Sequence, residues 1–156
     1  MHYIVVKNKI KNMKVKIING PNLNLLGKRQ TDIYGTSDFS SFLKKLQEKY
    51  PEMEIDHFQS NVEGEIVNMI HEVGFSYDGI IINAGGYTHT SISIADALVA
   101  VETPAIEVHI TNILAREEYR HMSFIAHACS GSIMGFGLDS YRLGLEGLIE
   151  IVRRKK

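Results

Sequence analysis

Apolar residues recur along the chain at two different spacings, which predict alternating strands and helices. Short runs rich in β-branched residues predict five strands, at about residues 15–18, 53–58, 80–82, 105–110 and 131–137. Between them, apolar residues three and four apart predict four helices, at about residues 39–50, 62–73, 91–99 and 141–152. Strand and helix therefore alternate, except for an irregular stretch between the last two strands.

This alternation predicts an α/β fold: a flavodoxin-like doubly wound sheet of five parallel strands with helices on both faces. Strands that are joined by helices pair in parallel, through right-handed crossovers. The Ile80–Ile82 run is the continuous apolar stretch expected of a strand buried on both faces. Ligands of such sheets bind beyond the carboxyl ends of the strands, so functional residues are expected in the loops there.

Composition narrows the class of protein. The 156 residues fit one domain, and 44% hydrophobic with 22% charged residues is ordinary for a globular protein. The net charge of −1 argues against nucleic-acid or membrane-surface binding, which needs a basic face. A single cysteine, Cys129, excludes an internal disulfide and a cysteine-based zinc site. Because no apolar run reaches about 18 residues and no signal peptide is visible, a cytoplasmic location is expected.

Polar residues gather where the predicted strands end, which suggests a site for a small, hydroxyl-rich molecule. In the fourth strand, Glu107 and His109 share one face, about 6–7 Å apart by the rise of a strand. A buried carboxylate orients an imidazole, so His109 is a candidate general acid or base, the alternative being a satisfied core histidine. His89 follows a glycine pair; it is a candidate ligand contact, a member of a helix N-cap cluster, or both. A metal site of His89, Glu107 and His109 matches no zinc spacing, so no metal is expected.

Two further groups of residues have both a functional and a structural interpretation. Segment 27–35 has glycines at both ends, as a lid would, and carries Arg29 and Tyr34. A nearby cation lowers the pKa of a phenol from about 10, so Tyr34 is a candidate base, unless the segment is simply a mobile surface loop. Arg116 and Arg120 share a face if that stretch is helical. They are candidates for binding a substrate carboxylate or for lowering the pKa of Tyr34, the alternative being exposed salt bridges.

Several ordered motifs closely resemble the type II 3-dehydroquinate dehydratase family. They are INGPNLNLLG (18–27), IYG (33–35), QSNVEGE (59–65), INAGGYTHTS (82–91), IEVHITN (106–112), AREEYR (115–120) and GFG (135–137). The resemblance begins at about Met13. Residues 1–12 are therefore expected to be a peripheral or disordered N-terminal extension, and residues 13–156 a single catalytic domain.

The resemblance implies dehydration of 3-dehydroquinate to 3-dehydroshikimate in the shikimate pathway, with no cofactor. Tyr34 would remove a proton alpha to the ketone, helped by Arg29 and Arg116, and Asn22 would hold a water on the enolate. His109, oriented by Glu107, would protonate the leaving hydroxyl. The substrate would be held by the remaining matched positions, which are Asn83, His89 and Arg120 for hydroxyls and the backbone of Ile110 and Thr111 for the carboxylate.

The resemblance also implies a homo-oligomer, a dodecamer built from trimers, in which Asp96 reaches a neighbouring subunit's site. In the loop, Gln30 and Thr31 stand where many relatives carry a Glu-Pro pair. Losing that proline is expected to make the open loop more mobile.

Two other functions are compatible with the predicted fold. A flavin- or nucleotide-binding protein is suggested by Gly135-Phe136-Gly137, but Ser140 stands at the last glycine position of that fingerprint. A receiver-like signalling module would need acidic residues after the first strand and an aspartate after the third. The chain has Asn22 and Asn83 in those loops.

Overall fold

The sheet has five strands, all parallel, as the sequence predicts. A computed structural model of the chain describes residues 10–28, 32 and 36–155. Its strands are Lys14–Asn19 (β1), Glu54–Gln59 (β2), Gly79–Asn83 (β3), Ala105–His109 (β4) and Gly131–Met134 (β5). They pair in the order β2-β1-β3-β4-β5. This is the order of a flavodoxin-like doubly wound sheet, so the predicted fold class is confirmed.

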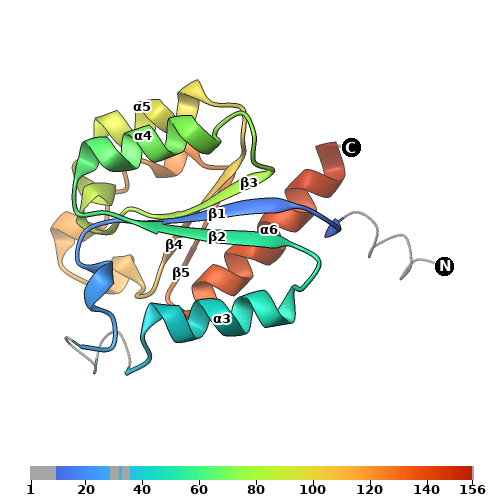
Figure 1. The fold of residues 1–156 in the computed structure, drawn as a ribbon. Coiled ribbons are helices and arrows are strands. Elements are labelled where there is room, and N and C mark those ends of the chain that lie inside the picture. The colour runs from blue at the N-terminus through green and yellow to red at the C-terminus, as the bar shows by residue number, and fades with distance from the viewer. Residues whose placement is uncertain (1–9, 29–31, 33–35, 156) are drawn as a thin grey trace.

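Four helices cover the two faces of the sheet. They are Phe39–Lys49 (α3), Glu63–Val73 (α4), Ile92–Ala100 (α5) and Asp139–Lys155 (α6). Helices α4 and α5 lie on one face, and α3 and α6 lie on the other (Figure 1). Polar side chains cap the N-termini of α3 and α5. The Asp38 side chain accepts a hydrogen bond from the Ser41 backbone amide, and the Ser91 side chain accepts one from the Ile94 backbone amide. Among the described residues, no helix is both long and apolar enough to cross a bilayer.

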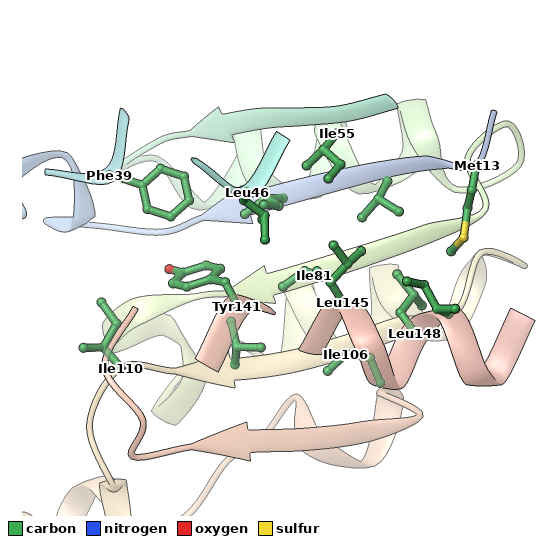
Figure 2. Close-up of a cluster of buried hydrophobic side chains, with 14 of the residues drawn as sticks. Met13, Phe39, Leu46, Ile55, Ile81, Ile106, Ile110, Tyr141, Leu145 and Leu148 are labelled. Carbon is green, nitrogen blue, oxygen red and sulfur yellow. The ribbon is translucent and has the colours of Figure 1, made fainter. Parts of the chain in front are cut away.

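The apolar core consists of two layers, one on each side of the sheet. Figure 2 shows the layer under α3 and α6, where Ile81 and Ile106 of the sheet meet Leu145 and Leu148 of α6. Ile80 and Ile82 point to the opposite layer, under α4 and α5. The isoleucine run in β3 is thus buried on both faces, as its sequence predicts.

The start of the described chain packs against the domain. Met13 is buried in the core, and Ile10 lies partly buried against it. The Asn12 amide donates to the Glu52 carbonyl over 2.7 Å. Residues 1–9 lie outside the described residues, and the expectation of a peripheral extension there stays a prediction.

Candidate active site

A cavity of about 320 Å³ opens at the carboxyl ends of β1, β3 and β4. Eight of the predicted site residues line it: Asn22, Asn83, His89, His109, Ile110, Thr111, Arg116 and Arg120. The loops after β1 and β3 are tightly packed against each other, since the Gly20 amide donates to the Asn83 carbonyl over 2.7 Å. A Cβ on Gly20 would lie 2.3 Å from the Ala84 carbonyl oxygen, so only glycine fits there. The cavity is thus where the topology predicts it.

His109 and Glu107 form a buried pair at the base of the cavity. The Nε2 atom of His109 lies 2.8 Å from Oε1 of Glu107, and the two side chains are 6% and 1% exposed. Ser123 donates to the same oxygen over 2.7 Å, and Ser132 donates to Oε2 over 2.8 Å. Burial alone would raise the pKa of the Glu107 carboxyl, but these hydrogen bonds hold it below its ordinary value. Glu107 is therefore a buried carboxylate with its charge compensated.

This pairing decides which ring nitrogen of His109 serves a ligand. An ionised carboxylate only accepts hydrogen bonds, so the Nε2 atom that faces Glu107 carries a hydrogen. His109 lines the cavity. Proton exchange with a ligand there would therefore go through Nδ1, while Nε2 keeps the ring in place.

Replacing Glu107 with glutamine is expected to lower kcat of the reaction predicted from the sequence by roughly 10- to 100-fold. This loss is smaller than that expected for removal of the general acid itself, because His109 stays in the cavity. Glutamine keeps the size of the side chain but removes the charge that compensates a protonated His109. Steady-state kinetics measure the effect. The control is Glu65→Gln, which changes an exposed carboxylate that accepts from Ser60 in the loop before α4. Equal kcat values for wild type and Glu107→Gln would contradict this role.

Arg116 and Arg120 meet through Glu117 and not along a helix. Two short 3-10 turns, Ile113–Ala115 (η3) and Glu118–Arg120 (η4), occupy this stretch. Oε2 of Glu117 lies 3.4 Å from Nε of Arg116 and 2.9 Å from Nε of Arg120. A backbone hydrogen bond and then the two guanidinium groups hold the pKa of Glu117 below its ordinary value. All three residues line the cavity, where two arginines face one glutamate, so this part of the lining carries net positive charge.

Two further polar residues of the cavity, Asn22 and His89, have hydrogen-bond partners that the sequence did not reveal. Asn22 has a left-handed backbone, with φ 68°, and its backbone N–H donates to Oδ1 of Asn61 over 2.9 Å. Nδ1 of His89 lies 2.7 Å from the Met122 carbonyl, which only accepts, so Nδ1 donates its hydrogen there. Asn61 thus holds the backbone of Asn22, and Met122 holds the ring of His89, each from another segment of the chain.

Not every predicted site residue lies at the cavity. Asp96 is exposed on α5 and does not line it. Arg29 and Tyr34, together with Gln30 and Thr31, lie outside the described residues. No group of three or more His, Cys, Asp or Glu side chains that could hold a metal ion is found in the described part of the chain.

Sequence reasoning missed a buried polar cluster beside the cavity. The Tyr141 hydroxyl donates to Oδ1 of Asn19 over 2.8 Å and accepts from Nδ2 of Asn83 over 2.9 Å. Asn19 in turn lies 3.1 Å from Nε2 of His57. In the sequence, Tyr141 is one more apolar position of the last helix. Asn83 was predicted as a site residue and Asn19 belongs to the motif at the end of the first strand, but nothing in the sequence connects the two through Tyr141.

Within this cluster, His57 gives a prediction for stability against pH. Burial, and then the charge of Lys16, lower the pKa of His57 from its ordinary value of 6.5. Below pH 6.5 the unfolded chain therefore binds a proton that the folded chain does not, so the free energy of unfolding falls as the pH falls. His57→Gln is expected to flatten this dependence below pH 6.5 in denaturant titrations. The exposed His71 supplies the control, and a slope unchanged from wild type in His57→Gln would refute the prediction.

Fold and cavity together define a class of protein. This is a doubly wound α/β protein with a small polar cavity at its strand ends, equipped with a carboxylate-bound histidine and two arginines. Such a cavity suits acid–base chemistry on a small anion. Gly135-Phe136-Gly137, which suggested a flavin or nucleotide binder, does not line it.

The comparisons with known proteins identify the family. The family model "Dehydroquinase class II" matches residues 13–149. A 3-dehydroquinate dehydratase of Clostridium perfringens is 52% identical over 146 residues, covering 92% of this chain and all of that protein. One of Caldicellulosiruptor bescii is 54% identical over 142 residues, covering 89% of this chain and 98% of that protein.

Solved structures agree with these sequence matches. The type II dehydroquinase of Butyrivibrio crossotus is 44% identical, with a TM-score of 0.84 over 88% of this chain and 97% of that one. That of Propionibacterium acnes is 36% identical, with a TM-score of 0.82 over 90% and 98%. The chain belongs to the class II dehydroquinase family, as the motifs in its sequence indicate.

Proposed function

We propose that this protein dehydrates 3-dehydroquinate to 3-dehydroshikimate and water, as a cofactor-free hydro-lyase of the shikimate pathway. Family membership and the names of the relatives support the reaction. The single observation that carries the proposal is the buried Glu107–His109 pair, because its imidazole lines a cavity that is also lined by two arginines. A carboxylic acid with several hydroxyl groups is the kind of ligand that this cavity suits.

In the proposed mechanism, Tyr34 acts as a tyrosinate base and His109 as the general acid. Tyr34 takes the proton alpha to the ketone, and the electrons of that C–H bond form an enolate. The enolate then collapses, the bond from carbon to the hydroxyl breaks, and Nδ1 of His109 gives its proton to the departing oxygen. Solvent resets the two residues by removing a proton from Tyr34 and returning one to His109. Arg29 and Arg116 would favour the tyrosinate by their charge.

Substrate binding is assigned to the polar residues around the cavity. Asn83, His89 and Arg120 would hold hydroxyl groups, and the backbone amides of Ile110 and Thr111 would hold the carboxylate. Asn22 would hold the water on the enolate oxygen. In support, all of these residues line one cavity. Before Arg120 binds substrate, its bond with Glu117 has to yield or be shared.

We also propose that the protein assembles into trimers and then a dodecamer, in which Asp96 completes a neighbour's site. Asp96 lies on an exposed face of α5 together with Ile92 and Val99, which are 62% and 64% exposed. Large apolar side chains on one helix face are typical of surfaces that contact a partner. Light scattering on the purified chain should give the mass of twelve copies. A stable monomer would contradict the assembly.

The reaction itself is tested by one spectrophotometric assay. Purified protein is mixed with fresh 3-dehydroquinate, without added metal or organic cofactor, and the near-ultraviolet absorbance is followed. The conjugated enone of the product absorbs there, so a steady rise is expected. No rise, with protein shown to be folded, would refute the proposed function. Borohydride added during turnover should leave the activity intact, because the proposed mechanism has no Schiff base.

A further inference from the structure

A chain of hydrogen bonds, buried in its middle, connects the cavity to the edge strand β2. The Gly85 amide lies 3.2 Å from Oδ1 of Asn83, whose Nδ2 lies 2.9 Å from the Tyr141 hydroxyl. The chain continues through Asn19 to Nε2 of His57. Asn19 and Tyr141 are fully buried, and Asn83 is 4% exposed. These residues come from β3, α6, β1 and β2, and we call them the Asn83–His57 chain.

The place of Tyr141 makes it the centre of this chain. Its ring packs in the apolar layer against Phe39, with the ring centroids 5.1 Å apart. Figure 2 shows its hydroxyl oxygen directed toward the carboxyl ends of the strands, where the cavity opens. The ring is thus held by apolar packing while its hydroxyl reaches the polar edge of the sheet.

The direction of donation along the chain follows from the Gly85 amide at one end and the Tyr141 hydroxyl in the middle. A backbone amide only donates, so the atom of Asn83 that faces Gly85 is its oxygen. The other end of that side chain, Nδ2, then donates to the Tyr141 oxygen. Because a phenol has one hydrogen, Tyr141 gives it to Oδ1 of Asn19, and Asn19 donates onward to His57. Every link therefore donates in the same sense, from Gly85 to His57.

This direction fixes what Asn83 presents to a ligand. An amide has two N–H hydrogens and two lone pairs on its oxygen, and the chain uses one of each. One N–H and one lone pair remain for the cavity that Asn83 lines. A hydroxyl group, which both donates and accepts, matches this pair. Turning the Asn83 amide over would set an N–H against the Gly85 amide and its oxygen against a hydroxyl whose hydrogen is already given.

We propose that Tyr141 is a positioning residue that, together with the Gly85 amide, holds the orientation of the Asn83 amide and so makes the cavity select for one ligand hydroxyl. This inference rests on the proposed function and deepens it, because it names the group that sets specificity at one point of the substrate. Tyr141 itself does not line the cavity. It acts through Asn83 alone.

The first test is Tyr141→Phe, which keeps the ring and removes the hydroxyl. The variant loses the bond from Asn83 and the bond to Asn19, of which only the first belongs to a residue that lines the cavity. We expect KM for 3-dehydroquinate to rise about 5- to 30-fold, the range of the one hydrogen bond that Asn83 loses. We expect kcat to stay within about 2-fold, because Asn83 binds the same hydroxyl before and during the reaction. Tyr77→Phe is the matched control, since that hydroxyl donates to Asp56 over 2.6 Å and does not line this cavity.

Substrate analogues separate positioning from general damage. A series of competitive inhibitors is made from the ring of the substrate, and each member has a different ring hydroxyl replaced by hydrogen. For the wild type, removal of one particular hydroxyl should weaken binding far more than removal of any other. For Tyr141→Phe, removal of that hydroxyl should weaken binding no more than removal of the others. The proposal would be overturned if Tyr141→Phe weakened the binding of every analogue by the same factor relative to wild type. It would also be overturned if Tyr141→Phe kept the wild-type KM. Thermal unfolding of each variant shows that the fold is retained.

A readout that needs no substrate distinguishes this inference from the proposed function. The donor direction requires His57 to accept at Nε2, so its neutral ring carries the hydrogen on Nδ1. Nitrogen NMR of the histidine-labelled full chain reports which nitrogen is protonated. Protonation on Nδ1 without dehydratase activity would refute the function and leave the chain standing. Dehydratase activity with the neutral His57 protonated on Nε2 would refute the donor direction and with it the proposal.

Discussion

His109→Ala is expected to lower kcat by about 10²–10⁴-fold, the usual contribution of a positioned general acid. The physical reason is the departure of hydroxide, which is a poor leaving group without a proton. The side chain of His109 is 6% exposed and lines the cavity, so its removal leaves room for water but supplies no donor oriented by Glu107. KM should change less than kcat, because the arginines and asparagines of the cavity stay in place.

The matched control for this variant is His127→Ala. His127 is exposed in the 3-10 turn Ala126–Ala128 and does not line the cavity. Both variants should be folded, as circular dichroism and thermal unfolding can establish. A folded His109→Ala enzyme with near-normal kcat would show that the proton comes from elsewhere.

Tyr34→Phe is expected to cause a loss of similar or greater size, because phenylalanine keeps the ring but has no oxygen to take the proton. Tyr34 lies outside the described residues, so this expectation rests on the family motif Ile33-Tyr34-Gly35. Turnover at saturating substrate measures it. Thermal unfolding should be nearly unchanged.

Tyr119, which contacts the cavity residue Arg120, gives this prediction a sharp control. The Tyr119 hydroxyl accepts from Nη2 of Arg120 over 3.2 Å, and its side chain is 66% exposed. A phenol beside a guanidinium is the kind of group that could serve as a base. Tyr119→Phe should nevertheless keep kcat near the wild-type value. If Tyr119→Phe abolished turnover and Tyr34→Phe did not, the assignment of the base would be wrong.

The fold and the centre of the site could be predicted from local patterns. Strand and helix periodicity gave the layers of the sheet, because burial against a sheet imposes spacings that a sequence displays directly. Two-residue alternation placed Glu107 and His109 on one face of β4, and the structure confirms that they are hydrogen-bonded. The rule that ligands bind at the carboxyl ends of parallel strands located the cavity.

What the sequence could not supply were contacts between distant segments. Tyr141 and Asn19 are 122 positions apart, and Ser132 follows Glu107 by 25, with no periodicity to connect them. A tyrosine on a buried helix face reads as an apolar residue, because only the fold decides where its hydroxyl ends. The four-residue spacing of Arg116 and Arg120 suggested a helix, but two short turns bring them together on Glu117.

The central claim is that proton removal and hydroxyl departure are performed by two different residues, Tyr34 and His109. Hydrogen exchange at the carbon alpha to the ketone, measured by NMR in deuterated water, tests it most directly. His109→Ala should still exchange this hydrogen for deuterium while forming almost no product, because the enolate forms and returns. Tyr34→Phe should show neither exchange nor product. A folded His109→Ala variant that fails to exchange, or a Tyr34→Phe variant that exchanges at the wild-type rate, would contradict the division of roles.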